Sequence, residues 1–321
     1  MNDAHLDGIK EALEASLGPG TIQEGVPLAP LTTFKIGGPA DLFFHAATSD
    51  ELAAVLSRSR ELGVPTFLLG RGANILVADA GFRGLVIRNQ VGGIEILESQ
   101  RVRVGSGVEV FPTLIQATVE EGLGGLHHFV GIPSSVGGAI WQNLHFLSPA
   151  PARERTVFIE EFVESAEIFS EQGRREEVGR DYFRFGYDYS ILHDRSDVVL
   201  SVTFQLRPQS LSEMKRVMRQ NLEWRRDRHP DLLRHPSAGS IFKKVEGVGA
   251  GRLVDECGLK GHRLGGAQIF PRHANIIVNQ GNATAADVLA LMELAQETVL
   301  RMTGHTLEPE ITLVGEFDPR K

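Results

Sequence analysis

The chain has 321 residues, 42% of them apolar and 23% charged, so it is long enough for about two domains whose cores need no covalent staples. Its single cysteine, Cys257, excludes an internal disulfide and any multi-cysteine metal site, so we expect no metal and a reducing cytoplasm as the compartment. The net charge of −8 argues against nucleic acid as a partner. Because the sequence has no long apolar run, we expect neither a membrane-spanning helix nor a secretory signal.

The first residues predict an amphipathic helix over about 4–17, because apolar side chains recur there at helical spacing. Beyond it, short apolar runs alternate with glycine, and one helix is expected at 50–62 with Ser49 or Asp50 as its cap. This mixture is typical of a β-rich α+β unit.

A second block begins near Gly93, and a third follows the last of its strands. The second is expected to hold strands at 94–98, 101–107, 161–169 and 197–206, a helix at about 109–121, and a hairpin turn at Glu171-Gln172-Gly173. The third begins with a helix at 211–227 and ends with one at 284–302, for which Thr284 and Asp287 form a capping pattern.

Glycine is over-represented early in the chain, since seventeen of the 35 glycines lie between Gly37 and Gly138 among apolar strands. Such clustering favours backbone that turns tightly or approaches a ligand closely, rather than disorder. Two segments stand out. One comprises Gly70, Arg71, Gly72, Ala73 and Asn74, and the other comprises Gly131, Ile132, Pro133, Ser134, Ser135, Gly137 and Gly138, with Gln142 and Asn143 shortly after.

The first segment can cradle a pyrophosphate with backbone N–H groups, although a tight β-turn explains it equally well. It lacks the third glycine of a dinucleotide fingerprint and leads into another strand, which disfavours a doubly wound NAD-binding domain. The second segment offers unblocked donors to a large flat ligand, with a buried crossover as the alternative. Motifs of P-loop NTPases, zincins and α/β-hydrolases are absent from the sequence.

Two polar groupings in the third block could carry chemistry. Ser240 follows Gly239 and lies near Lys244, so its hydroxyl is either presented to a phosphate-bearing ligand or caps a turn. Glu308 and Glu310 flank a proline at the entry to an apolar run, and their spacing allows both carboxylates to share one face. A surface position is the plain alternative for each glutamate.

Taken in order, segments spread from about 29 to 317 resemble the family of UDP-N-acetylenolpyruvoylglucosamine reductases. They are LTTFKIGGPA, LLGRGANILVADAGFRGLVI, GIPSSVGGAIWQN, FGYDYS, HPSAGSIFKK, GRLVDECGLKGHRLGGAQIFPRHANIIVNQGNATAADV and LEPEITLVGEF. The resemblance implies an α+β fold: two FAD-binding subdomains of the vanillyl-alcohol-oxidase type, at 1–92 and 93–208, and an α+β substrate-binding domain at 209–321. It also implies the branch of the family that lacks a tyrosine-bearing loop.

The resemblance further implies an activity. FAD is the bound cofactor, held by the two glycine segments together with Gln142 and Asn143, and NADPH is the reductant. A hydride reaches C3 of the enolpyruvyl ether of UDP-N-acetylglucosamine and Ser240 protonates C2, which gives UDP-N-acetylmuramate for peptidoglycan synthesis. Glu310 stands beside the substrate carboxylate, where we expect a raised pKa because an ionised glutamate would repel the developing charge.

The same resemblance places Arg228, Lys244 and His273 in the pocket for the UDP diphosphate, where an arginine fork matches phosphate. The resemblance therefore implies two nucleotide partners, which are the UDP-sugar substrate and NADPH. We expect a monomer with neither a nucleic-acid nor a membrane partner.

One position departs from the family, because Asp188 in YDYS stands where an arginine commonly holds the substrate carboxylate. Either another cation takes its place or the site works less well. The candidate cations are Arg184, Arg195, and, within the unusually long segment HFLSPAPARERT, Arg153 and Arg155. Because of Asp188, a second interpretation is that the chain is a paralogue that binds flavin or UDP-sugar but has lost or altered catalysis. A third interpretation is another flavin oxidoreductase on the same scaffold.

Overall fold

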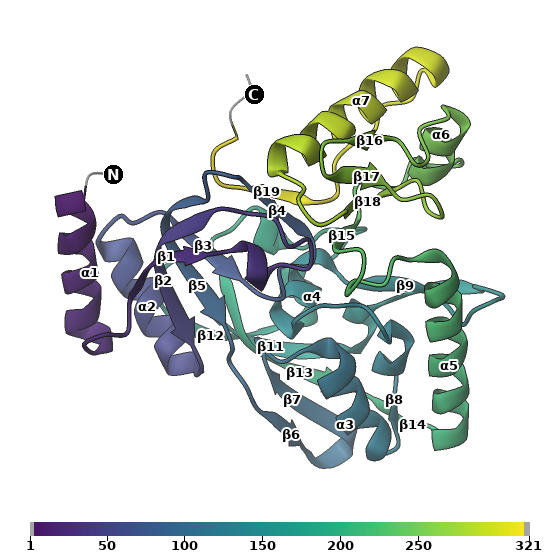
Figure 1. Ribbon diagram of the computed structural model, residues 1–321. Coiled ribbons are helices and arrows are strands. Elements are labelled where there is room, and N and C mark those ends of the chain that lie inside the picture. Colours follow the sequence, from purple (N-terminus) through teal and green to yellow (C-terminus); the bar gives the residue numbers. More distant parts are fainter. Residues whose placement is uncertain (1–2, 318–321) are drawn as a thin grey trace.

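The first sheet carries the N-terminal part of the chain in this computed structural model, which describes residues 3–317 (Figure 1). Its strands run in the order β1-β2-β5-β3, with β1 antiparallel and the others parallel. Their bounds are Gln23–Pro27 for β1, Pro39–Ala46 for β2, Thr66–Leu69 for β3 and Phe82–Asn89 for β5. Helices α1 (Asp3–Leu17) and α2 (Ser49–Glu61) pack against it through an apolar cluster that includes Leu13, Leu52 and Leu85.

An antiparallel sheet of order β12-β11-β13-β7-β6 organises the middle of the chain. Its strands are β6 (Ile94–Ile96), β7 (Arg101–Gly105), β11 (Val163–Phe169), β12 (Arg175–Gly179) and β13 (Val198–Gln205). Three helices bury apolar side chains in its core: α3 (Ile115–Glu120), α4 (Val136–Gln142) and α5 (Leu211–Arg228). Two small pairs complete this part, β8 (Leu123–Gly124) with β14 (Arg207–Pro208), and the hairpin of β9 (His145–Ser148) and β10 (Arg155–Phe158).

The third sheet has the order β15-β18-β17-β16 and is covered by the two last helices. Its elements are β15 (Ser237–Ser240), α6 (Ala250–Glu256), β16 (Arg263–Leu264), β17 (Ala267–Ile269), β18 (Ile276–Asn279) and α7 (Ala285–Thr303). Beyond α7 the chain returns to the first part of the molecule (Figure 1), where β19 (Thr312–Val314) pairs in parallel with β4 (Ile75–Val77).

Several elements confirm the sequence prediction because local chemistry defines their ends. Helix α7 begins after Thr284, whose hydroxyl accepts from the Asp287 N–H at 3.0 Å, and it ends at Gly304 with φ of +74°. The expected turn joins β11 to β12, with the Gly173 N–H donating to Ser170 O. The α+β class is confirmed as well.

Two predicted boundaries are wrong. The cap of α2 is Thr48 rather than Ser49 or Asp50, because only Thr48 has a glutamate, Glu51, three positions later to complete a capping box. The helix expected at 109–121 begins only at Ile115, since Phe111 precedes a proline and is extended, as proline requires of the residue before it.

The division at 92 and 208 stays a prediction. Three apolar clusters follow it in outline, although Met214 of α5 packs in the cluster of the second sheet rather than in that of the third. Within residues 3–317, no helix combines the length and the apolar character needed to cross a membrane.

Removing the cap of α7 should destabilise the protein. We expect Thr284→Ala to lower the free energy of unfolding by about 1 kcal/mol, because the Asp287 N–H loses its acceptor. Chemical denaturation would measure the loss, and Thr284→Ser, which keeps the hydroxyl, should restore most of it. Equal stability of the alanine variant and the parent protein would contradict this role.

Candidate active site

One large cavity collects most of the residues that the sequence analysis singled out. Its volume of about 1510 Å³ exceeds the roughly 300–1,000 Å³ of pockets that hold one drug-sized ligand, so a cofactor and a substrate fit together. Its walls come from the loop after β3, from α4, from the β9–β10 hairpin, from the end of α5, from β15 and from the segment before β19. Every residue predicted for the site lines this cavity except Asn143 and Arg228.

The first glycine segment is held in a conformation that only glycine adopts easily. Gly72 has φ of +61°, and a Cβ on it would lie 2.9 Å from Leu31 O. A Cβ on Gly70 would lie 2.5 Å from Ser135 Oγ, so the two glycine segments touch. Within the described chain, the backbone N–H groups of Arg71, Gly72 and Ala73 donate no hydrogen bond, which leaves them free for an anionic ligand.

The second segment forms the entry to α4. Ser135 caps this helix by accepting from the Gly138 N–H at 3.3 Å. Gln142 reaches the cavity, and its buried Oε1 has no partner among residues 3–317, as expected of a group that awaits a ligand donor. Asn143 is fully buried instead and donates to Gly186 O at 2.9 Å, so it shapes the neighbouring loop rather than the cavity surface.

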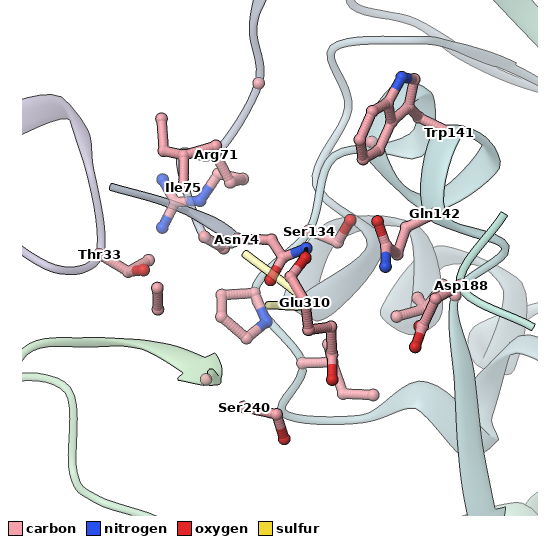
Figure 2. Close-up of a pocket in the computed structure, with 18 of the residues that line it drawn as sticks. Thr33, Arg71, Asn74, Ile75, Ser134, Trp141, Gln142, Asp188, Ser240 and Glu310 are labelled. Carbon is pink, nitrogen blue, oxygen red and sulfur yellow. Dashed lines mark hydrogen bonds between the residues drawn. The ribbon is translucent and has the colours of Figure 1, made fainter. Parts of the chain in front are cut away.

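Ser240 and Glu310 face the same space in the cavity (Figure 2). Gly239 has φ of +78°, and the Ser240 hydroxyl makes no hydrogen bond with any described residue. The Glu310 N–H donates to Ile241 O at 2.8 Å, which ties the segment before β19 to the residue that follows Ser240. Burial, and then the charge of Asp188, raise the pKa of Glu310 to about 8 against the opposing effect of Lys243, which confirms the expected direction.

The other glutamate of this segment points elsewhere. Glu308 is exposed, and its carboxylate lies 3.6 Å from Lys243 Nζ. The alternation of a strand does not apply here, because Pro309 forms only an isolated bridge with Phe242 and β19 starts at Thr312.

Asp188 is a buried carboxylate at the wall of the cavity (Figure 2), with φ of +51°. Its Oδ2 has no partner among the described residues, and its Oδ1 lies 3.7 Å from Nδ1 of His145. His145 Nδ1 is also 3.3 Å from Asn143 O, so both neighbours of this nitrogen are acceptors and it carries a proton. His145 was not among the predicted site residues, although it is the first residue of the segment HFLSPAPARERT.

None of the four arginines expected near Asp188 makes an ion pair with it. Arg184 is exposed, Arg155 pairs with Glu161 at 2.9 Å, and Arg195 donates to the Tyr182 hydroxyl at 3.0 Å. Arg153 and Arg195 both line the cavity, and the guanidinium of Arg153 lies over the ring of Trp224.

The predicted substrate residues divide into two groups. Lys244 and His273 line the cavity, and burial lowers the pKa of His273. Arg228 lies outside the lining, with its guanidinium carbon 4.9 Å from the centre of the Trp224 ring. Its neighbour Arg225 lines the cavity in its place, and burial lowers the pKa of this guanidinium to about 10.

Comparisons with known proteins agree with the geometry. A family model described as the C-terminal domain of UDP-N-acetylenolpyruvoylglucosamine reductase matches residues 231–314, and one described as an FAD binding domain matches 40–179. A UDP-N-acetylenolpyruvoylglucosamine reductase of Moorella thermoacetica is 39% identical over 90% of this chain and 92% of its own length. The corresponding protein of Anaeromyxobacter sp. is 40% identical over 93% of this chain and 90% of its own. The crystal structure of the reductase from Thermus caldophilus covers 91% of this chain and 99% of its own, with 33% identity and a TM-score of 0.74.

Removing the charge of Asp188 should lower the pKa of Glu310. In Asp188→Asn, the ionised form of Glu310 no longer faces a like charge, so we expect its titration midpoint to move from about 8 to lower pH. Carboxyl-carbon NMR on protein labelled at glutamate would measure the midpoint. Asp181→Asn, which removes a carboxylate outside the cavity lining, is the control, and an unchanged midpoint in Asp188→Asn would contradict the coupling.

Proposed function

The chain belongs to the UDP-N-acetylenolpyruvoylglucosamine reductase family, and on that premise we propose that it reduces UDP-N-acetylglucosamine enolpyruvate to UDP-N-acetylmuramate in peptidoglycan synthesis. FAD is the bound cofactor and NADPH the reductant. One observation carries the proposal: Glu310, whose pKa of about 8 favours its acid form at neutral pH, faces the same cavity as the unpartnered Ser240 hydroxyl.

The residues present fit FAD. The cavity has room for it, the free N–H groups of Arg71, Gly72 and Ala73 suit a pyrophosphate, and the unpartnered Oε1 of Gln142 suits a ring or ribityl donor. When bound, FAD would supply the redox chemistry, which is the transfer of a hydride from NADPH to C3 of the enolpyruvyl group.

The side chains of this protein supply the proton and the electrostatics. As the hydride adds to C3, the double bond opens and negative charge builds on C2 and on the adjoining carboxylate. Ser240 donates the proton that C2 requires, which completes the saturated lactyl ether. Glu310 in its acid form donates a hydrogen bond to the carboxylate, where an ionised glutamate would repel it.

The diphosphate of the sugar nucleotide belongs at the cationic end of the cavity, where Lys244, His273 and Arg225 lie. We also propose that the protein acts as a monomer in the cytoplasm, in keeping with its single cysteine.

A second candidate is a protein that binds flavin and UDP-sugar but has lost or altered catalysis. It is favoured by Asp188, a buried carboxylate where the family commonly has a cation. Anaerobic mixing with NADPH and then with the enolpyruvyl substrate distinguishes the two, since only the reductase bleaches and then rapidly regains its flavin colour.

Replacing the proton donor should separate the two halves of the reaction. We expect Ser240→Ala to be reduced by NADPH at the parent rate but to be re-oxidised by the substrate at least 100-fold more slowly, a loss typical of a missing general acid. Stopped-flow absorbance of the flavin would measure both rates. Ser240→Cys keeps a proton donor and should recover part of the second rate; an unimpaired alanine variant would exclude Ser240 as the donor.

The substrate half-reaction should also depend on pH in a definite direction. Because the acid form of Glu310 is required, the rate of re-oxidation should fall as pH rises through about 8. In Glu310→Gln this alkaline decline should disappear, at a lower overall rate. A decline that persists in the glutamine variant would assign it to a different group.

A further inference from the structure

The β9–β10 hairpin, which the proposed reaction leaves without a role, is fastened to α5. Asn221 of α5 is fully buried, and its Oδ1 accepts from the Ala150 N–H at 2.9 Å. Its Nδ2 donates to Ser148 Oγ at 2.9 Å and to His128 O at 3.1 Å. The tip of the hairpin is therefore held at a defined position beside α5, as Figure 1 shows for the chain path.

This attachment brings guanidinium groups from two elements together. The Cζ of Arg153, from the hairpin, lies 4.4 Å from the centre of the Trp224 ring, and the Cζ of Arg228 lies 4.9 Å from the same ring. The Cζ of Arg225 lies 5.7 Å from the ring of Phe146, which itself meets Trp224 edge to face at 5.9 Å. Arg153 also has φ of +53°, an uncommon conformation for a residue with a side chain, which the surrounding contacts must maintain.

The positive charge of this cluster, Arg153, Arg225 and Arg228, is uncompensated. In residues 3–317, no carboxylate lies within 4.0 Å of any of the three guanidinium groups, and none of them donates a hydrogen bond. Burial and the charge of Arg228 lower the pKa of Arg153, and burial with the charge of Arg225 lowers the pKa of His229. Arg153 and Arg228 are exposed and Arg225 is half-buried, so water solvates part of their charge, and an anion bound among them would relieve their mutual repulsion.

The stacking on aromatic rings indicates which kind of anion fits. A guanidinium held over a ring by a cation–π contact can still donate from its N–H groups, and none of these three groups donates to a described residue. Such N–H groups form paired hydrogen bonds to phosphate oxygens, and several guanidinium groups match a ligand with more than one negative charge.

We propose that Arg153, on the β9–β10 hairpin, is a phosphate-binding residue that acts together with Arg225 on the diphosphate of a nucleotide ligand in the cavity. The nucleotide class rests on the proposed function, which offers two sources, the UDP-sugar and NADPH. The hairpin thereby contributes to ligand affinity without touching the reacting carbons.

Nucleotide binding by charge-matched variants of the FAD-loaded protein tests this role. We expect Arg153→Gln to weaken UDP binding by about tenfold or more in isothermal titration calorimetry, because a charge-assisted pair is lost. Arg155→Gln is the matched control, since Arg155 lies in the same hairpin but pairs with Glu161 and does not line the cavity. Its affinity for UDP should stay within about twofold of the parent value. Arg153→Lys, with a point charge and no fork, should fall between the two.

Binding measurements with uridine, UDP and NADP⁺ identify which nucleotide carries the phosphate groups that Arg153 binds. Uridine, which carries none, should bind Arg153→Gln and the parent protein equally. A loss confined to UDP assigns Arg153 to the sugar nucleotide, a loss confined to NADP⁺ assigns it to the dinucleotide, and a loss for both shows that they share the subsite. Unchanged affinity for both, or an equal loss for uridine, would overturn the proposal.

The same experiment is independent of the proposed reaction. Turnover of the enolpyruvyl substrate by the parent protein tests the reductase activity, whereas UDP affinity reports on Arg153 even in a protein without turnover. An unchanged flavin spectrum and melting temperature in Arg153→Gln would show that the fold is intact.

Discussion

The cavity depends on the return of the C-terminal segment to the first glycine loop. Asn74 makes this junction from both sides: its carbonyl accepts from the Thr312 N–H at 3.0 Å, and its amide donates to Glu310 O at 3.2 Å. The parallel pairing of β19 with β4 continues the contact. The Glu310 N–H also donates to Ile241 O, so both the N–H and the carbonyl of Glu310 are hydrogen-bonded, the first to the residue after β15 and the second to Asn74. The carboxyl group is thereby carried into the cavity wall.

The cavity lining contains two groups of opposite charge, the carboxyl groups of Glu310 and Asp188 and the guanidinium groups of Arg153 and Arg225. In the first group, burial and the charge of Asp188 raise the pKa of Glu310 to about 8, which favours its acid form at neutral pH. In the second, the guanidinium groups of the hairpin and α5 lie on aromatic rings without acidic partners. A ligand with phosphates at one end and an enolpyruvyl group at the other is oriented by this contrast alone.

The charge of the buried Asp188 is only partly compensated by its surroundings, because its Oδ2 has no partner among the described residues. A buried carboxylate is costly unless it is paired, and the ring of His145 is the basic group that the hairpin provides at 3.7 Å. The hairpin that supplies His145 is the same one that carries Arg153 to α5. The β9–β10 hairpin thus lies near Asp188 through His145 of its first strand and near Arg225 and Arg228 of α5 through Arg153 at its tip.

Local chemistry in the sequence determined the elements whose ends depend on residues within one turn, such as α7 with its Thr284 cap and the turn at Gly173. The sequence also identified both glycine segments, because glycine marks positions where the backbone adopts a positive φ or closely approaches another group. Tertiary structure alone decided that Glu308 points to solvent while Glu310 points into the cavity, and that Ala150 meets Asn221, 71 positions away. These outcomes depend on which surfaces the sheets bring together, and no pattern of neighbouring residues records such contacts between distant parts of a chain.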